Sequence, residues 1–293
     1  MSLYQPGILP AVPTQSRYLE FGHRPGADLV EALQLLASME LGDEFVVGLG
    51  AGLVQGLGGN VEGLTAFPNL TGPGCEVPST QSDLWVWLRG DNRGELVLMA
   101  RGLEAELGDA FGLEHMVDGF RHDTGRDLTG YEDGTENPKG DDAINAAFAT
   151  GRGEGLDGSS FVAVQQWVHD LGRFGSFEQQ DRDNIIGRRL KDNEELEDAP
   201  ETAHVKRTAQ ESFDPEAFVL RRSMPWADSS GEGLMFVAFG NSHDAFGAQM
   251  RRMVGLDDGI VDGLFRFSRP VTGSYYWCPP VIDGHLNLSA LGL

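Results

Sequence analysis

Cysteine is scarce in this sequence: Cys75 and Cys278 are the two cysteines among 293 residues. They form no CxxC pair, so neither a thiolate metal site nor a disulfide framework can be built from them. Such usage fits a reducing cytosol. The sequence also lacks a run of about 18 apolar residues, which a membrane-spanning helix would need. Its N-terminal residues do not form a basic segment followed by an apolar one. We therefore expect a cytoplasmic protein with no membrane partner.

Basic residues are few as well, with 22 Lys and Arg against 45 Asp and Glu and a net charge of −23. A surface of this charge repels phosphate backbones and anionic membranes, so nucleic acid is not an expected partner. A functional site for an anion would need its own local cluster of arginines. The hydrophobic share of 40% and the charged share of 23% are ordinary for globular proteins and suffice for a core.

Several common catalytic motifs are missing. There is no HExxH zinc motif, no GxSxG nucleophile motif and no phosphate-binding GxxxxGK[ST] loop. Residues 48–59 (GLGAGLVQGLGG) are rich in glycine, but they lack the GxGxxG spacing and a well-placed acidic partner downstream. Zinc hydrolases, α/β-hydrolases and dinucleotide-binding enzymes are therefore poorly supported.

The pattern of apolar residues predicts two α+β halves, residues 1–145 and 146–293, on either side of a glycine-rich region at 121–160. Mostly antiparallel strands in each half fit two ferredoxin-like units packed together. The expected helices are 27–39, 103–112, 177–190 and 243–255, and the expected strands are 45–49, 83–89, 94–101 (a hairpin with 83–89), 161–169, 233–240 and a final hairpin-like pair in 264–280.

Two segments hold the candidate functional residues. In GYEDGTENP (130–138), Gly130, Gly134 and Pro138 predict a tight turn that holds Asp133, although Asp133 and Asn137 could also simply cap turns. AHVKRT (203–208) contains His204, and LRRSMPW (220–226) contains Arg221 and Arg222. Taken singly, a structural histidine and surface ion pairs explain this second group equally well.

Taken together, these segments resemble the dye-decolourising peroxidases, most closely the bacterial cytoplasmic branch. The resemblance is carried, in order along the chain, by PSTQSDLWVWLRGDNRG (78–94), GxxDG (130–134), IIGR (185–188), AHVKRT, RRSMPW, GLMFVAFG (233–240) and VTGSYYWCPP (271–280). It implies a dimeric α+β barrel-type fold. It also implies a haem b peroxidase that reduces hydrogen peroxide and oxidises organic donors such as dyes and phenols through a ferryl intermediate.

The resemblance further assigns roles to single residues. It implies that His204 binds the haem iron and that Asp133, Arg221 and Ser223 act on the opposite face of the haem. Asp262 is the candidate partner of the second ring nitrogen of His204, because a carboxylate there strengthens a ligating imidazole. The remaining cofactor contacts would be Arg188, as a partner of a haem propionate, and Leu234 and Phe236, as walls of the pocket.

Two other functions and two partners stay open. The chain could be a haem- or porphyrin-handling protein with incidental peroxidase activity, or a haem-free oligomeric structural protein. The family favours a homo-oligomer. The C-terminal tail, 283–293, resembles the peptides by which some of these peroxidases dock to an encapsulin shell, but its leucines could equally pack on the protein's own surface or on a neighbouring subunit.

Overall fold

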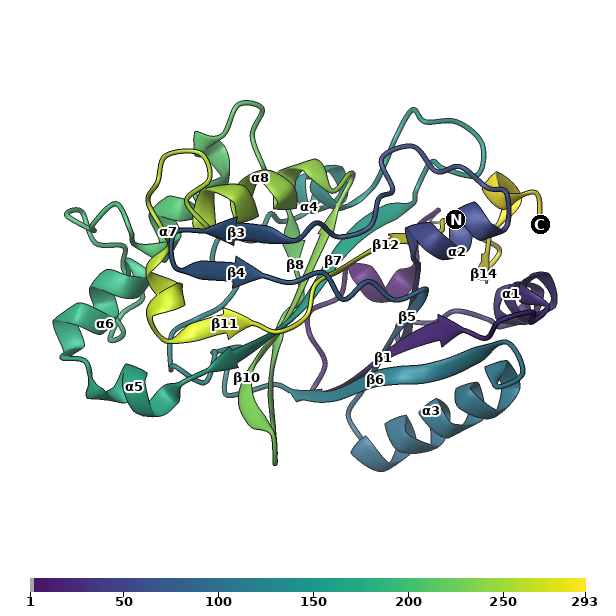
Figure 1. Ribbon diagram of the computed structural model, residues 1–293, viewed down its shortest axis with the longest axis horizontal. Coiled ribbons are helices and arrows are strands. Elements are labelled where there is room, and N and C mark those ends of the chain that lie inside the picture. The colour runs from purple at the N-terminus through teal and green to yellow at the C-terminus, as the bar shows by residue number, and fades with distance from the viewer. Residues whose placement is uncertain (1–2) are drawn as a thin grey trace.

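A closed antiparallel barrel organises the computed structural model, which describes residues 3–293 (Figure 1). Its eight strands are the main part of the ten-stranded sheet found in these residues. The first half of the chain supplies β1 (Gln15–His23), β2 (Phe45–Leu49), β5 (Leu84–Gly90) and β6 (Phe111–Phe120), and the second half supplies β7 (Ser160–His169), β9 (Met224–Asp228), β10 (Gly231–Gly240) and β12 (Ser274–Cys278).

The two halves repeat one strand order. Neighbouring strands run β6-β1-β5-β2 in the first half and β12-β7-β10-β9 in the second. If the four barrel strands of each half are numbered 1 to 4 along the chain, both halves have the spatial order 4-1-3-2. The halves join where β6 pairs with β9 and where β12 pairs with β2. Each junction contains a single residue pair, Gly119 with Trp226 and Trp277 with Leu49, so backbone pairing between the halves is sparse.

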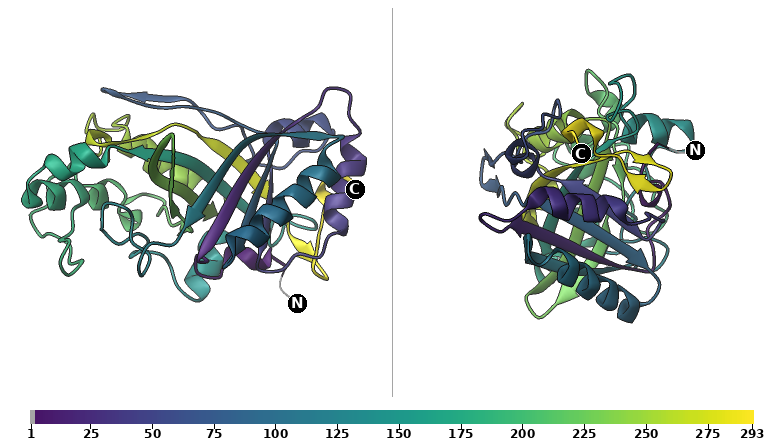
Figure 2. Two further views of the ribbon diagram at one scale, coloured as in Figure 1. Left: turned by 90° about the horizontal axis from the view of Figure 1, so that it is seen from below. Right: turned by 90° about the vertical axis from the view of Figure 1, so that its right-hand side faces the viewer.

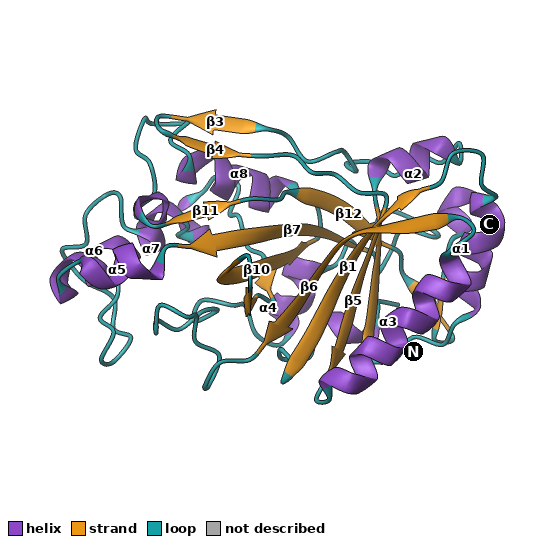
Figure 3. Cartoon of the chain, turned by 60° about the horizontal axis from the view of Figure 1, so that its bottom comes forward, coloured by secondary structure: helices purple, strands orange, loops and turns teal. Residues whose placement is uncertain are grey.

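Helices cover the outside of the barrel at two ends (Figures 1 and 3). Helices α1, α2 and α3 gather at the end where the C-terminus lies and α5 to α8 towards the other, whereas α4 contacts β8 and β10. The helices are α1 (Leu29–Ser38), α2 (Ala51–Gly56), α3 (Arg93–Leu107), α4 (Asp141–Ala147), α5 (Leu171–Ser176), α6 (Gln179–Ile186), α7 (His204–Arg207) and α8 (Asp244–Met253), with 3-10 turns η1 (Pro6–Ile8), η2 (Gln210–Ser212), η3 (Gly263–Arg266) and η4 (Ser289–Leu291).

Six short strands complete the fold. Figure 2 shows the hairpin of the first two, β3 and β4, at the margin of the molecule, outside the barrel. Strand β11 pairs with β7 beside β12, and β8 extends the sheet next to β10. The strands are β3 (Leu70–Gly72), β4 (Cys75–Val77), β8 (Leu220–Arg221), β11 (Ser268–Pro270), β13 (Val281–Ile282) and β14 (His285–Leu286).

The core consists of an aromatic barrel interior, two outer layers and a small fourth cluster of Tyr131, Phe174, Ile185 and Phe267. All eight barrel strands contribute to the interior cluster, in which Trp85 stacks on Trp87 and Tyr276 at ring-centroid distances of 6.5 and 6.0 Å. A second cluster lies between the first-half sheet and α1 and α3, and a third lies between the second-half sheet and α8. This third layer borders the candidate active site.

Most predicted elements are confirmed, but three predictions are wrong. Residues 94–101 do not form a strand and 103–112 do not form a separate helix, because α3 runs through both and β6 begins at Phe111. The expected strand pair in 264–280 is not a hairpin, because β11 and β12 both pair with β7. The long strands β1 and β6 were not predicted.

The C-terminal tail packs on the first half of the chain. Leu286, Leu288 and Leu291 are buried in the cluster under α1 and α3, and the backbone N–H of Leu41 donates to the carbonyl of Gly284 at 2.8 Å. This agrees with the expectation that these leucines pack on the protein itself. Within residues 3–293, no helix is long and apolar enough to cross a membrane.

Candidate active site

A loop shaped by glycine holds Asp133. Gly130 and Gly134 have φ angles of +88° and +76°, which favour glycine, and so they allow the chain to turn tightly on both sides of the aspartate. The backbone N–H of Gly130 donates to the carbonyl of Asp127 at 2.8 Å, and that of Asp133 donates to the carbonyl of Gly125 at 3.3 Å. The predicted turn is therefore present, with Asp133 inside it.

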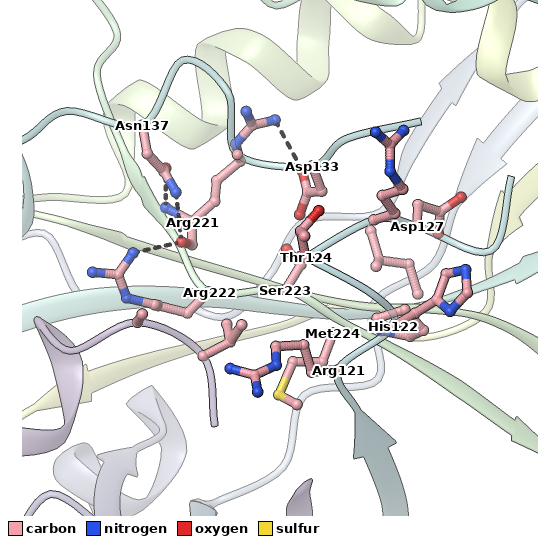
Figure 4. A pocket seen from close by; sticks show the side chains of 17 residues that line it. Arg121, His122, Thr124, Asp127, Asp133, Asn137, Arg221, Arg222, Ser223 and Met224 are labelled. Carbon is pink, nitrogen blue, oxygen red and sulfur yellow. Dashed lines mark hydrogen bonds and ion pairs between the residues drawn. The ribbon is translucent and has the colours of Figure 1, made fainter. Parts of the chain in front are cut away.

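Asn137 fastens this loop to β8. Its Nδ2 donates to the carbonyl of Arg221 at 3.0 Å, and its Oδ1 accepts from the backbone N–H of Arg221 at 2.8 Å. The same clamp brings the Arg221 guanidinium to the Asp133 carboxylate, with Nη1 and Oδ1 3.6 Å apart (Figure 4). Asn137 thus joins two segments 84 residues apart, which goes beyond capping a turn.

His204 is the first residue of α7, and its ring is oriented by a buried carboxylate. Its Nδ1 donates to Oδ2 of Asp262 at 2.8 Å, and the other oxygen of Asp262 accepts from the backbone N–H of Leu264 at the same distance. The Asp262 side chain is fully buried, whereas the His204 side chain is 22% exposed. Among residues 3–293, Nε2 of His204 has no hydrogen-bond partner, so it is the nitrogen available to a ligand.

Two adjoining hollows are both lined by His204, Asp133 and Arg221, so the structure brings these predicted residues to one place. We call them the apolar hollow and the glutamate hollow. The apolar hollow has walls of Leu234, Phe236, Phe246, Met250 and Met253. The glutamate hollow is lined by Glu132, Glu136, Glu195 and Glu211 together with Arg188.

A third hollow shares Asp133 and Arg221 with the other two and lies between the 121–127 loop, β8, β9 and residues 11–12. We call it the arginine hollow, because four arginines line it. Ser223 also lies there, and its Oγ accepts from the backbone N–H of Val237 at 3.3 Å. The arginines are Arg121, Arg126, Arg221 and Arg222, of which Figure 4 labels Arg121, Arg221 and Arg222.

The remaining predicted residues also line these hollows. Leu234 and Phe236 are two positions apart on β10, so they face the same side of the sheet. Arg188 lies at the glutamate hollow, where its guanidinium donates to Glu136 at 2.6 Å and to Glu195 at 3.2 Å. Arg188 is therefore paired with carboxylates of this chain.

Sequence reasoning missed His169 and Asp127, which lie beside the site. Nε2 of His169 donates to Asp127 at 3.1 Å, and Nδ1 lies 2.7 Å from Oγ of Ser268. Burial alone would raise the pKa of Asp127, but the hydrogen bonds from His169 and Thr129 hold that pKa below its ordinary value. The available sequence signals were that Asp127 lies in the glycine-rich region and that His169 ends a predicted strand.

The donor set of this cavity fits haem. A histidine with a free Nε2 and a carboxylate on Nδ1 is the usual arrangement for a ligating imidazole. Aromatic and thioether side chains provide an apolar wall, and an aspartate–arginine pair lies in the same cavity. Residues 3–293 contain no group of three or more His, Cys, Asp or Glu side chains that could hold a bare metal ion.

Comparisons with known proteins show which family the chain resembles. Residues 124–283 match the family model described as Dyp-type peroxidase, C-terminal. A dye-decolorizing peroxidase of Mycobacterium tuberculosis is 32% identical over 224 residues, which cover 74% of this chain and 67% of that protein. Across four curated relatives of this name, the match spans between 61% and 67% of their length.

Solved structures are similar over nearly the whole chain. A dye-decolorizing protein from V. cholerae has a TM-score of 0.86 and 26% identity, with 98% of both chains covered. A variant of DypB from Rhodococcus jostii RHA1, in complex with heme, has a TM-score of 0.87 and 26% identity over 95% of this chain and 97% of that one.

Proposed function

Since the chain belongs to the Dyp-type peroxidase family, whose members are haem-dependent enzymes, we propose that it binds haem b and reduces hydrogen peroxide at the site of His204, Asp133 and Arg221. The two electrons come from organic donors such as dyes and phenols. One peroxide and two donor molecules then give two waters and two oxidised donor radicals. The observation that carries the proposal is that His204 and the Asp133–Arg221 pair line the same two hollows.

His204 would hold the haem iron through Nε2. Its hydrogen bond to Asp262 fixes the tautomer and the orientation of the ring, and the carboxylate increases the electron donation of the imidazole. Asp262 is itself fixed by the N–H of Leu264, so the ring has little freedom to turn. When bound, haem supplies the oxidising chemistry, and the protein supplies position, charge and proton transfer.

Asp133 and Arg221 would act directly on peroxide. A peroxide molecule loses a proton from one oxygen and needs one on the oxygen that leaves as water. One carboxylate within reach of both oxygens can accept the first proton and return it to the second. The guanidinium of Arg221 is always charged and stabilises the negative charge that develops as the O–O bond breaks.

The other predicted residues would position the reactants. The hydroxyl of Ser223 accepts from Val237, which leaves its proton free to donate towards Asp133 or peroxide. Leu234 and Phe236 would exclude water on one face of the cofactor. Arg188 would bind a propionate in exchange for part of its present pairing with Glu136 and Glu195.

We also propose that the halves are ferredoxin-like units, as their shared fourth-first-third-second strand order supports. The division at residues 145 and 146 stays a prediction, because α4 (Asp141–Ala147) spans that point. Self-association, a cytoplasmic location and docking of the tail to an encapsulin shell also stay predictions. Docking would require the buried leucines of the tail to leave their present core.

Substitution of the three central residues tests the proposed function. We expect His204→Ala to lose most of its haem, which the Soret absorption of the purified protein measures. Asp133→Ala and Arg221→Leu should keep haem, but at least one should react with peroxide about 10²–10⁴-fold more slowly in a stopped-flow experiment. Asp141→Ala, at an exposed position of α4, is the control. Full haem occupancy of His204→Ala would refute the ligand assignment. Wild-type peroxide rates in both other variants would favour a haem-handling protein.

A further inference from the structure

The arginine hollow is rich in positive charge, although the protein as a whole is strongly acidic. The chain carries −23 overall and has 22 basic residues, yet four arginines line this one hollow. The adjoining glutamate hollow carries four glutamates instead. The arginine hollow is therefore a local cluster of positive charge, which an anion site in this acidic protein would need.

Two of the four arginines have no carboxylate partner. Arg126 pairs with Glu132 at 2.9 Å and with Asp123 at 3.5 Å, and Arg221 pairs with Asp133. No ion pair with Arg121 or Arg222 occurs in residues 3–293. Their positive charge is thus not compensated by a neighbouring side chain.

Arg222 is held rigidly by the backbone. Its guanidinium donates to the carbonyls of Ile8, Leu9 and Arg221, which occupies three of its five N–H groups. Burial, with a further contribution from Arg89, lowers the pKa of Arg222 to about 10. The charge of Arg222 is therefore less favourable here than in water, and an anion beside it would favour that charge.

Neutral donors and a limited volume complete the hollow. The hydroxyls of Ser223 and Thr124 line it, and the carboxylate of Asp127 is already held by His169 and Thr129. The cavity volume is about 170 Å³, where a water molecule takes roughly 30 Å³. A compact molecule fits this space, whereas a large dye does not.

We propose that the arginine hollow is a binding site for a small organic monoanion, a compact carboxylate held between Arg121 and Arg222. The carboxylate oxygens would accept from the two guanidinium groups and from the hydroxyls of Thr124 and Ser223. Binding at this site requires no reaction with peroxide and can be measured by itself, although the hollow shares Ser223, Asp133 and Arg221 with the proposed peroxidase site.

Isothermal titration calorimetry of the purified, haem-loaded protein with benzoate at low ionic strength tests this site. We expect saturable binding of one benzoate, with no shift of the Soret band and no comparable binding of benzamide, the neutral analogue. Arg121→Gln should weaken binding by roughly tenfold, as the loss of one charge-assisted hydrogen bond does. Arg101→Gln makes the same charge change at an exposed position of α3 and should leave the affinity unchanged.

Four results would overturn the proposal: no saturable binding, equal binding of benzamide, equal weakening by Arg121→Gln and Arg101→Gln, or a benzoate-induced Soret shift that Arg121→Gln leaves intact. Arg121 is exposed, so its substitution should not disturb folding. Arg121→Lys, which keeps the charge but loses the planar fork, provides a second test. It should bind benzoate more weakly than the wild type and more tightly than Arg121→Gln.

Discussion

At the scale of single residues, Asp262 shows how one carboxylate can serve two donors. Its two oxygens accept separately, one from Nδ1 of His204 and the other from the N–H of Leu264. An asparagine has one acceptor oxygen and therefore cannot serve both donors at once. The proposed iron ligand thus depends on a residue 58 positions further along the chain.

We expect Asp262→Asn to weaken haem retention. The asparagine loses either the hydrogen bond from Nδ1 of His204 or the hydrogen bond from the N–H of Leu264 that fixes residue 262. Loss of such a supporting carboxylate typically costs 10–100-fold in affinity or activity. The rate of haem transfer to an apoprotein acceptor measures this. The control is Asp258→Asn, which removes the partner of Arg207 on the same helix, α7, without touching His204. Equal effects of the two substitutions would mean that Asp262 only supports α7.

Glu20 is a buried carboxyl of the barrel interior that the proposed reaction does not use. Tyr276 donates to its Oε1 at 3.0 Å. Burial raises the pKa of Glu20, more than the nearby His115 and the hydrogen bond from Tyr276 lower it. A carboxyl whose pKa is raised by folding stabilises the folded protein, and this contribution is complete at pH values below its unfolded pKa of about 4.5. The contribution is lost as the pH rises through the pKa of the folded state.

Glu20→Gln should therefore stabilise the protein at neutral pH, since glutamine keeps the acceptor for Tyr276 and removes the buried charge. We expect a gain of about 1–3 kcal/mol at pH 7 that disappears as the pH falls below about 4.5. Urea unfolding between pH 4 and pH 8 measures this. Glu106→Gln, at an exposed position of α3, is the control. A variant less stable than the wild type at pH 7 would contradict the assignment.

At the scale of elements, the clamp between Asn137 and β8 positions the pair that is proposed to act on peroxide. Asn137→Ala leaves the backbone N–H and carbonyl of Arg221 without these partners, a cost of about 1–3 kcal/mol. We expect lower stability and a slower reaction with peroxide, measured by thermal unfolding and stopped-flow spectroscopy. Asn241→Ala removes one exposed hydrogen bond on a nearby loop and should change neither. An unchanged peroxide rate would show that the clamp does not position Arg221.

The sequence predicted those elements whose apolar residues follow a simple period. Strands β2, β7 and β10 are apolar runs, and α8 carries apolar residues at helical spacing. Strand β1 was missed because polar residues, Ser16, Arg17 and Glu20, are buried in it, and β6 was missed because few of its residues are buried. Arg17 of β1 lies opposite Asp118 of β6 and pairs with it at 2.6 Å, which no hydrophobic pattern can show.

The error in α3 has a different cause. Leu96, Ala100, Leu103 and Leu107 are buried at intervals of four, three and four, which is helical spacing. This helical pattern extends across residue 102, which separates the predicted strand 94–101 from the predicted helix 103–112. Neither segment alone contains enough of the pattern to show it. Asn92 also caps the helix by accepting from the N–H of Gly94 at 2.9 Å, a role that was interpreted as part of a hairpin turn.

The candidate site was predicted from short motifs, and the missing parts were those that depend on tertiary contacts. His204 and Asp133 stand in recognisable segments. The roles of Asn137, His169 and Arg222 follow from partners 84, 42 and more than 200 residues away. The cluster of Arg121, Arg126, Arg221 and Arg222 likewise appears only once β6 and β8 are brought together.

At the scale of the whole molecule, the two halves hold together mainly through side chains. Each junction of the barrel has a single backbone pair, whereas the aromatic interior draws on all eight strands. The C-terminal tail adds a further connection, because it follows the last strand of the second half and packs in the core of the first. The two proposed units are therefore structural repeats within one shared core, and the tail should contribute to the stability of both.

Leu288→Ala tests this role of the tail. Leu288 is 3% exposed and belongs to the cluster under α1 and α3, so its truncation leaves a cavity there and should cost about 2–5 kcal/mol. Leu256→Ala, at a side chain that is 42% exposed, should change stability by less than about 0.5 kcal/mol. Urea unfolding measures both, and hydrogen exchange should show the loss of protection in α1 of the first half, far along the chain from the substitution. If Leu288→Ala unfolds like the wild type, the tail is not part of the core, and docking of its leucines to a shell becomes the better explanation for their spacing.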